Sequence, residues 1–212
     1  MKKKIVLICM AAALCAMLIV GGTLAYFTDT EAATNVITMD GLDITLTETG
    51  ASSANSVYGK EYSNIMPGDL LEKDPTVTNN DAPAYLRVKV EWPTVVNSGN
   101  SSDNYTFSEA DVRHKVVDPA TQDVTYAAGI DTAVWKKVVD NGVTYYYYIA
   151  NGGVLATGAS VTLFDQVVVP ASWGNGFQGA NFQIGITAEA IQTANIAFDA
   201  ADPAASFAGF TA

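Results

Sequence analysis

The sequence A-Y-L-R-V-K-V-E-W, residues 84–92, decides the fold of this 212-residue chain. From Leu86 to Trp92 every second residue is apolar, and each residue between them is charged. Successive side chains of a strand point to opposite faces, so this period of two predicts a strand with one buried and one solvated face. A helix would need a period near 3.6 instead.

The same period recurs along the rest of the chain. Upstream, Leu42, Ile44 and Leu46 alternate with polar residues in a strand predicted from Val36 to Thr47. The remaining predicted strands cover residues 76–80, 112–117, 124–126, 133–139, 143–149, 160–169 and 181–191. Pro67-Gly68 and Asn141-Gly142 are turn signals, the second suited to a two-residue hairpin. The pattern predicts an all-β protein, interrupted by a short helix that Ser108 and Asp111 would cap.

A run of four tyrosines, Tyr145 to Tyr148, lies in the second strand of that hairpin and must place two rings on each face. We interpret one pair as core and the other as contacting neighbouring strands. Carbohydrate stacking, a protein contact or an adhesive patch are the alternatives. Trp92, Trp135 and Trp173 are interpreted in the same way, as core or rim residues.

The N-terminus reads as an export signal. Three lysines, residues 2–4, precede an apolar run from Ile5 to Val20, and Gly21-Gly22-Thr23-Leu24-Ala25 follows. Small residues at Thr23 and Ala25 suit signal peptidase, so we expect cleavage between Ala25 and Tyr26. The alternative is an uncleaved anchor, because residues 5–24 match the roughly 20 residues that span a bilayer.

Cleavage would change the composition of the chain. Cys9 and Cys15 would leave with the signal, so the mature chain would have no disulfide or thiolate site. Basic residues would fall from 11 to 8 against 22 acidic ones, a net charge of 8 − 22 = −14. Nucleic acid is then not an expected partner, because phosphate binding needs clustered Lys and Arg. The tail, residues 197–212, has no apolar span and no L-P-x-T-G motif, so we expect no stable membrane anchor after cleavage.

Several motifs together resemble one known family. The run G-G-T-L-A-Y-F-T-D-T-E-A-A-T-N-V-I-T, residues 21–38, is similar to SipW-dependent signal peptides and the mature N-termini that follow them. P-G-D at residue 67, Y-L-R-V-K-V at residue 85, L-F-D-Q-V at residue 163 and I-T-A-E-A-I-Q at residue 186 follow in order. The chain thus resembles the TasA/camelysin family of Gram-positive surface proteins, some of which build extracellular biofilm fibres.

The sequence offers little for catalysis. His114 is the single histidine of the chain and has no G-x-S-x-G elbow to accompany it. A zinc protease of the common kind needs two histidines one helical turn apart, so the peptidase activity named for camelysin has no evident site. Acidic residues at 40, 69, 81 and 123 are available as calcium ligands, so calcium binding stays an alternative, although they form no D-x-D-x-D-G loop. We therefore predict no catalytic residue, cofactor or metal site and expect a protein that is not an enzyme.

These observations lead to a prediction of fold and function. We expect a signal helix (residues 1–25) and a jelly-roll-like antiparallel β-sandwich (residues 26–212), secreted to the matrix or surface of a Gram-positive cell. The resemblance implies self-assembly into fibres by an N-terminal donor strand, residues 26–39, with a second matrix protein as a further partner. The candidate anchors are Tyr26, Phe27, Val36, Ile37 and Met39. An ordinary first strand, a camelysin-like metallopeptidase and a glycan-binding adhesin are the alternatives.

Overall fold

The computed structural model describes residues 42–49, 65–208 and 210. The chain divides into two compact units, Met1–Met39 and Asp40–Ala212, and all described residues belong to the second. The predicted signal helix, the cleavage site at Ala25 and Tyr26 and the predicted donor segment lie outside the described residues.

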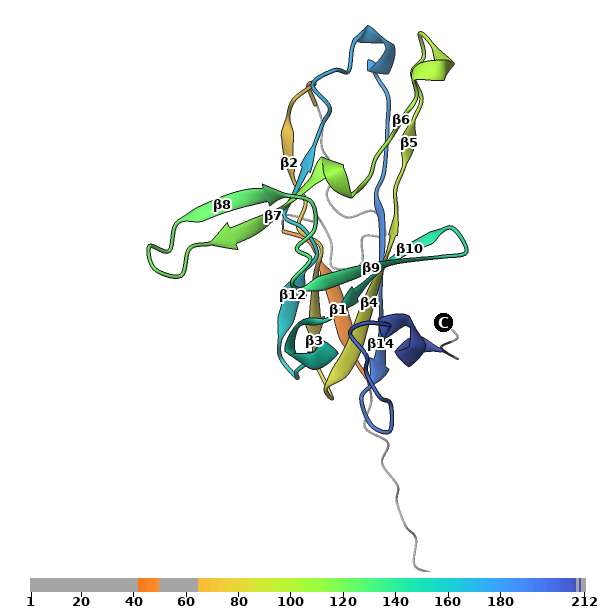
Figure 1. The fold of residues 1–212 in the computed structure, drawn as a ribbon. Helices are drawn as coiled ribbons and strands as arrows, with labels where there is room; N and C mark the ends of the chain where they lie inside the picture. Colours follow the sequence, from red (N-terminus) through yellow and green to blue (C-terminus); the bar gives the residue numbers. More distant parts are fainter. Residues whose placement is uncertain (1–41, 50–64, 209, 211–212) are drawn as a thin grey trace, which may run out of the picture. The chain divides into compact units, whose positions relative to one another are not determined.

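Figure 1 shows that the regular structure of the described residues is almost wholly β-strand, which confirms the all-β prediction. No helix among the described residues is both long and apolar enough to cross a membrane. The described residues form fourteen strands: β1 (Ile44–Thr47), β2 (Leu70–Glu72), β3 (Thr76–Asn79), β4 (Ala84–Glu91), β5 (Thr94–Val95), β6 (Tyr105–Thr106), β7 (Val112–Val117), β8 (Val124–Ala128), β9 (Trp135–Asp140), β10 (Val143–Tyr148), β11 (Val154–Leu155), β12 (Ser160–Thr162), β13 (Gln166–Val168) and β14 (Gly185–Gln192). Five short 3-10 helices connect them: η1 (Ser101–Asp103), η2 (Glu109–Asp111), η3 (Ala150–Gly153), η4 (Asn175–Phe177) and η5 (Pro203–Phe207).

One layer of the sandwich contains β4 at its centre. β14 pairs with one edge of β4 over eight residues, and β10 and β11 share its other edge. β9 completes the layer by pairing with β10. The hairpin turn between β9 and β10 is of the predicted type, because Asn141 and Gly142 both have positive φ, at 48° and 82°.

The other layer is built around two bent strands, one formed by β2 and β3 and the other by β12 and β13. β2 and β3 run antiparallel to β13 and β12, and backbone hydrogen bonds from Lys73 to Asp165 and from Leu163 to Pro75 carry the pairing across the bend. β1 adds to β3, while β7 and then β8 add to β13. The chain changes layer between β3 and β4, between β4 and β7, between β8 and β9, between β11 and β12 and between β13 and β14, as in a jelly-roll-like antiparallel sandwich.

The core lies between the layers and follows the predicted alternation. Leu86, Val88 and Val90 of β4 are at most 3% exposed. Tyr146 and Tyr148 of β10 join them, together with Phe164 and Val167 from the opposite layer. The other two tyrosines of the run pack on the outer face of their sheet, which confirms the core and neighbour interpretation. Trp135 is buried, and Trp92 and Trp173 are half-buried at the margin of the core.

Some predictions of detail were wrong. Strands β2, β5, β6 and β11 were not predicted, since two or three residues are too few to show a period. Leu42 is 40% exposed and precedes β1, so it does not share the half-buried face of Ile44 and Leu46. The capped helix was correct, because Ser108 and Asp111 form a reciprocal capping box at η2.

Candidate functional site

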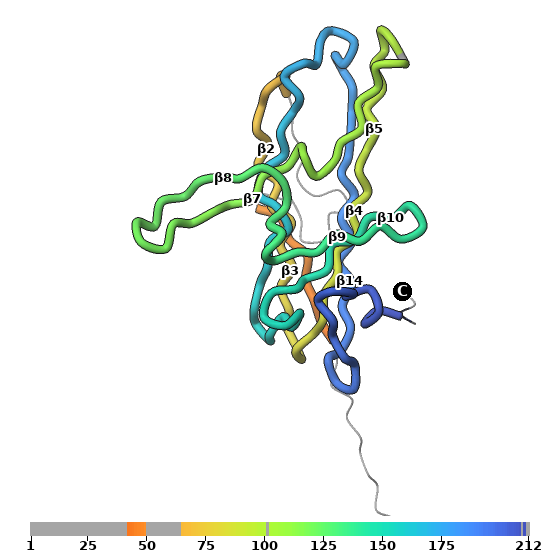
Figure 2. Tube along the Cα trace, in the orientation of Figure 1, coloured from red at the N-terminus to blue at the C-terminus, as the bar shows by residue number. Residues whose placement is uncertain are grey.

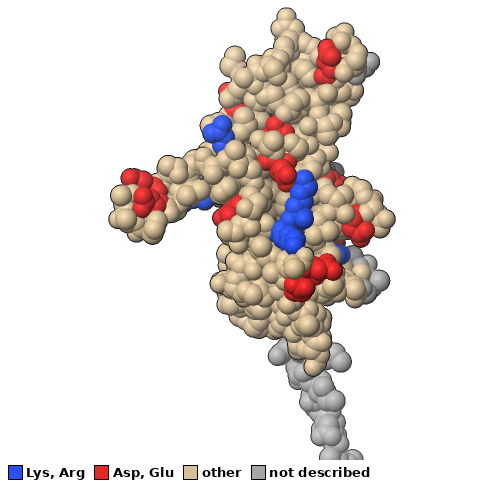
Figure 3. Space-filling model, in the orientation of Figure 1, with Lys and Arg blue, Asp and Glu red and all other residues tan. Residues whose placement is uncertain are grey.

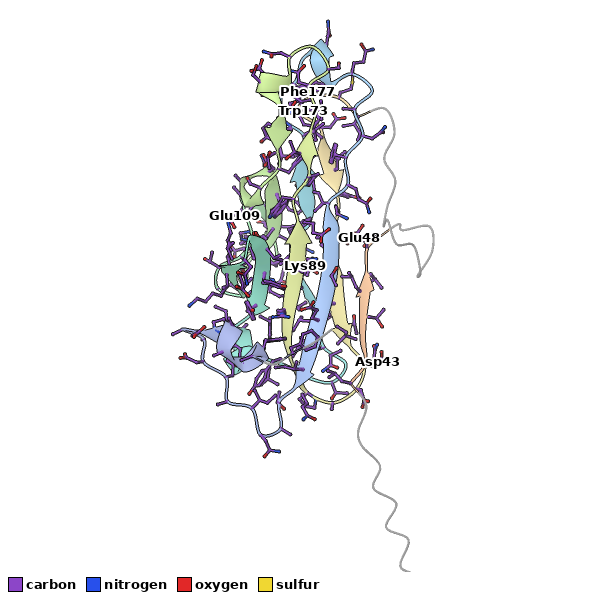
Figure 4. The ribbon with its side chains drawn as sticks, turned by 90° about the vertical axis from the view of Figure 1, so that its right-hand side faces the viewer. Asp43, Glu48, Lys89, Glu109, Trp173 and Phe177 are labelled. Carbon is purple, nitrogen blue, oxygen red and sulfur yellow. The ribbon has the colours of Figure 1, made fainter. Side chains whose placement is uncertain are left out.

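Two edge strands, one from each layer, lie side by side at one margin of the sandwich. In Figure 4 the orange strand β1 lies next to the blue strand β14. Within the described residues, β1 forms a ladder with β3 alone and β14 with β4 alone. Each strand therefore has one edge whose N–H and C=O groups no described strand pairs, and such groups are a template for an added strand.

The core is incompletely covered at this margin. Ile44 and Leu46 of β1 and Ile186 and Ala188 of β14 all point toward the core, yet each stays half-buried. Val88, the cross-strand partner of Ala188, is fully buried by comparison. An extended segment added here would cover apolar surface as well as pair with backbone groups.

Polar contacts hold both ends of the short strand β1 in place. At its start, Asn80 Nδ2 donates to Thr45 Oγ1 at 2.7 Å, and the Asn80 backbone N–H donates to the Asp43 carbonyl at 2.9 Å. At its end, the backbone N–H and hydroxyl of Thr49 both donate to the Asp74 carboxylate, at 2.7 and 2.5 Å. Strand β1 is thus fixed to its own layer although it has only four residues. We refer to the unpaired edges of β1 and β14 as the open edge.

The open edge was not predicted from the sequence. The five predicted assembly residues, Tyr26, Phe27, Val36, Ile37 and Met39, lie outside the described residues. The acceptor side was missed, because an edge strand is a property of strand order that no local pattern reveals. The alternation of Ile44 and Leu46 with polar residues indicated a strand, but not that one of its edges is unpaired.

A second prominent surface is the outer face of the β14-β4-β10-β9 sheet, which the C-terminal segment covers. Phe207 is 4% exposed and packs edge-on against Tyr147, with ring centroids 5.4 Å apart. Phe198 stacks on Tyr85 at 5.0 Å. Lys136 Nζ fastens the segment by donating to the carbonyls of Ala200 and Ala201. We call residues 196–210 the C-terminal cover; residue 209 lies outside the described residues.

Arg87 is the charged centre beneath this cover. Its Nε donates to Glu189 Oε2 at 2.5 Å across the β4–β14 ladder. Its guanidinium also lies over the rings of Tyr145 and Phe207, at 4.5 and 4.7 Å from their centroids. Burial by itself lowers the pKa of Arg87, but the hydrogen bonds with Tyr147 and Glu189 outweigh this and raise the pKa overall. Arg87 is a paired structural cation, and it is not free to bind an anion.

Two tyrosine–carboxylate pairs surround the capped helix η2. Tyr105 donates to Asp111 Oδ1 at 2.5 Å, and burial together with this carboxylate raises the pKa of Tyr105 to about 12. Tyr146 donates to Glu109 Oε2 at 3.0 Å. Burial of Tyr146, and after it the Glu109 carboxylate, raise the pKa of the Tyr146 hydroxyl. Lys137 Nζ lies 3.1 Å from the same Glu109 oxygen. Since Tyr146 is only 1% exposed, it cannot serve as an open platform for carbohydrate.

The potential catalytic and metal-binding groups are dispersed. His114 Nδ1 lies 2.9 Å from the Gly129 carbonyl oxygen, and the side chain is half-buried. Asp69 accepts a hydrogen bond from the Met66 backbone N–H and so closes its own turn. Within residues 42–49, 65–208 and 210, no three His, Cys, Asp or Glu side chains lie close enough together to hold a metal ion.

Comparison with known proteins identifies the family. A family model described as camelysin metallo-endopeptidase matches residues 1–196. The chain belongs to the camelysin family. This confirms the resemblance drawn from the sequence motifs. A search of curated proteins finds no match.

The family description implies a metal that the described residues do not fit. Catalytic zinc sites use three protein ligands, most often with histidine among them. This camelysin-family chain has one histidine, and its described carboxylates do not converge on it. The donor set in the described part therefore does not match a zinc peptidase site of the common kind.

The C-terminal cover extends past the family match. The match ends at residue 196, and Phe198, Phe207 and Phe210 follow it. The aromatic face that they cover, with Tyr85 and Tyr147, lies within the matched part. The camelysin family match therefore does not extend over the part of the cover that follows residue 196.

Proposed function

We propose that this protein is a secreted structural protein that assembles into extracellular matrix fibres of a Gram-positive bacterium. In this proposal the N-terminal strand of one subunit, residues 26–39, docks on the open edge of the next. The observation that carries the proposal is the open edge itself: two adjacent edge strands, each with one unpaired side among the described residues, beside half-buried apolar side chains.

The free energy available at the open edge favours a stable contact. Strand β14 is eight residues long, and a strand docked along it would form up to about eight main-chain hydrogen bonds, each worth about 1 kcal/mol net. Covering the half-buried side chains of Ile44, Leu46 and Ile186 would add about 25 cal/mol for each Å² of apolar surface removed from water. The cost of association and of ordering the donor must be subtracted from both contributions.

The position of the donor predicts the geometry of the assembly. Residues 26–39 precede β1, which begins at Ile44, so each subunit would carry a donor next to its own acceptor in sequence. A donor that docks on a different subunit makes a head-to-tail contact, and such contacts give open filaments when the rotation does not close. A dedicated signal peptidase that cuts after Ala25 would free the donor. A second matrix protein that has its own donor strand or acceptor edge would join the same filament.

A deletion variant tests donation directly. A chain without residues 26–39 would keep the acceptor edge but could not donate, so we expect it to form no fibres alone and to shorten wild-type fibres when mixed with them. Electron microscopy of the mixtures measures fibre length. A matched control replaces residues 26–39 with a scrambled order of the same residues. Fibres of unchanged length in the presence of the deletion variant would contradict strand donation.

A metallopeptidase is the second candidate, and the family description favours it. Its test is independent of assembly. Casein hydrolysis that a chelator abolishes, together with a bound metal found by elemental analysis of the purified protein, would establish this activity. Fibre formation without hydrolysis would support the structural role alone.

A further inference from the structure

The hairpin of β7 and β8 projects from the layer to which it belongs. Figure 2 shows it leaving the two layers as a ribbon of its own. β13 pairs with β7 only at Val112 and Arg113, and β8 pairs with β7 alone among the described strands. We call residues 114–127 the arm. A two-stranded ribbon is only marginally stable in water, so a further strand would stabilise it.

The arm exposes an unusual amount of apolar surface. Four of the nine large apolar side chains that are exposed in the described residues lie on it: Val116, Val117, Val124 and Tyr126, each between 41% and 48% exposed. The register pairs Val117 with Val124 and Lys115 with Tyr126, which places Val117, Val124 and Tyr126 on one face together with Lys115 and leaves Val116 on the opposite face. Such a patch marks an interaction surface more often than a solvated one.

The outer edge of β8 has none of the devices that normally protect a sheet edge. Its sequence, V-T-Y-A-A at residues 124–128, contains no charge and no proline. No residue from 124 to 128 has a positive φ. Natural edge strands are commonly protected by lysine, proline or a bulge. An uncharged edge without these features is suited to pair with another strand.

The charges at the two ends of the arm indicate which partner the arm would bind. Acidic side chains gather at the tip, where Asp118 and Asp123 bracket the turn (Figure 3). Arg113 and Lys115 lie at the base, and within the described residues neither forms an ion pair. If two arms pair antiparallel about Tyr126, Val124 faces Ala128 of the other copy, so each acidic tip comes near the basic base of its neighbour. The arm is therefore complementary to itself.

We infer that the β8 edges of two copies of this protein pair antiparallel about Tyr126, forming a four-stranded β7-β8-β8-β7 ribbon with two-fold symmetry. The two Lys115 residues lie three strand spacings apart, about 14 Å, so salt screens their repulsion. Two strands of five residues give an interface smaller than the roughly 1,200 Å² of a stable complex. The contact is weak alone and becomes effective when many copies are held in an array. It does not depend on strand donation and would link subunits or fibres sideways.

Single-cysteine variants test the pairing and its register. In a chain with Cys9→Ser and Cys15→Ser, Tyr126→Cys provides the only thiol. Directly opposed residues of antiparallel strands have Cα atoms about 4.5 to 5.5 Å apart, within the range that a disulfide spans. We expect mild oxidation to give a covalent dimer on a non-reducing gel. Val139→Cys on β9 is the matched control, because that valine is also exposed, at 58%, and should stay monomeric.

Two further variants make the result decisive. Thr125→Cys lies one residue away on the opposite face and faces residue 127 of the other copy, so it should cross-link far less than Tyr126→Cys. Tyr126→Lys would place two charges at the two-fold axis and should abolish reversible association in sedimentation equilibrium, with an unchanged circular dichroism spectrum. The inference is overturned if Tyr126→Cys dimerises no more than Val139→Cys, or if Thr125→Cys dimerises equally well.

Discussion

At the scale of single residues, two adjacent glycines in η3 serve different purposes. Gly152 and Gly153 both have positive φ, at 67° and 81°. A side chain at Gly152 would meet open space, whereas a Cβ at Gly153 would lie 2.3 Å from the ring of Phe198. The first glycine is needed for its backbone conformation alone, and the second also makes room for the C-terminal cover.

This difference predicts two unequal losses of stability. Gly152→Ala should lower the free energy of unfolding by about 1 kcal/mol, the cost of a left-handed conformation. Gly153→Ala should lose about 2 kcal/mol more, because Phe198 must move off Tyr85. Urea denaturation measures both. In a Phe198→Ala background the two alanine variants should cost the same, and a persistent difference would contradict the role assigned to the ring.

Tyr105 predicts a dependence of stability on alkaline pH. Burial and Asp111 raise its folded-state pKa to about 12, above the ordinary value of 10.0. The folded state holds this proton more tightly than the unfolded state, so its contribution is complete below pH 10 and is lost as the pH rises from 10 to about 12. Tyr105→Phe should flatten this part of the stability profile. Equal slopes for the two proteins above pH 10 would argue against the Tyr105–Asp111 pair.

At the scale of elements, the C-terminal cover buries aromatic surface that the sheet would otherwise expose. Deleting residues 197–212 should uncover Tyr85 and Tyr147, which are 7% and 2% exposed in the whole chain. We expect the free energy of unfolding to fall by at least about 3 kcal/mol and a dye that binds apolar surface to fluoresce. Phe207→Leu keeps most of the apolar area and should cost less. An unchanged urea midpoint after the deletion would show that the cover contributes nothing.

Elements with a clear local signal were predictable from sequence. Strand β7 has the predicted bounds, Val112–Val117, and the capping box at Ser108 follows from two side chains three residues apart. The cover and the open edge were not predictable. The phenylalanines of the cover follow no strand or helix period, and what they contact depends on a sheet assembled from residues 84–192. The open edge depends on which strands end up without neighbours, so only the strand order reveals it.

At the scale of the whole molecule, charge opposes self-assembly. The chain has a net charge of −11, so copies repel one another at low ionic strength. The open edge and the arm both have to overcome this repulsion. Since salt shortens the Debye length to about 10 Å at 0.1 M, raising ionic strength should speed assembly. Light scattering in a salt series measures the rate, and assembly that slows with added salt would contradict this expectation.

The most direct measurement combines intact mass with electron microscopy of the secreted protein. Cleavage after Ala25 predicts a chain of 212 − 25 = 187 residues that begins at Tyr26. The account predicts this mass in a sample of filaments, and no filaments from the variant without residues 26–39. A secreted protein that stays monomeric, and behaves identically with and without residues 26–39, would contradict assembly through the open edge.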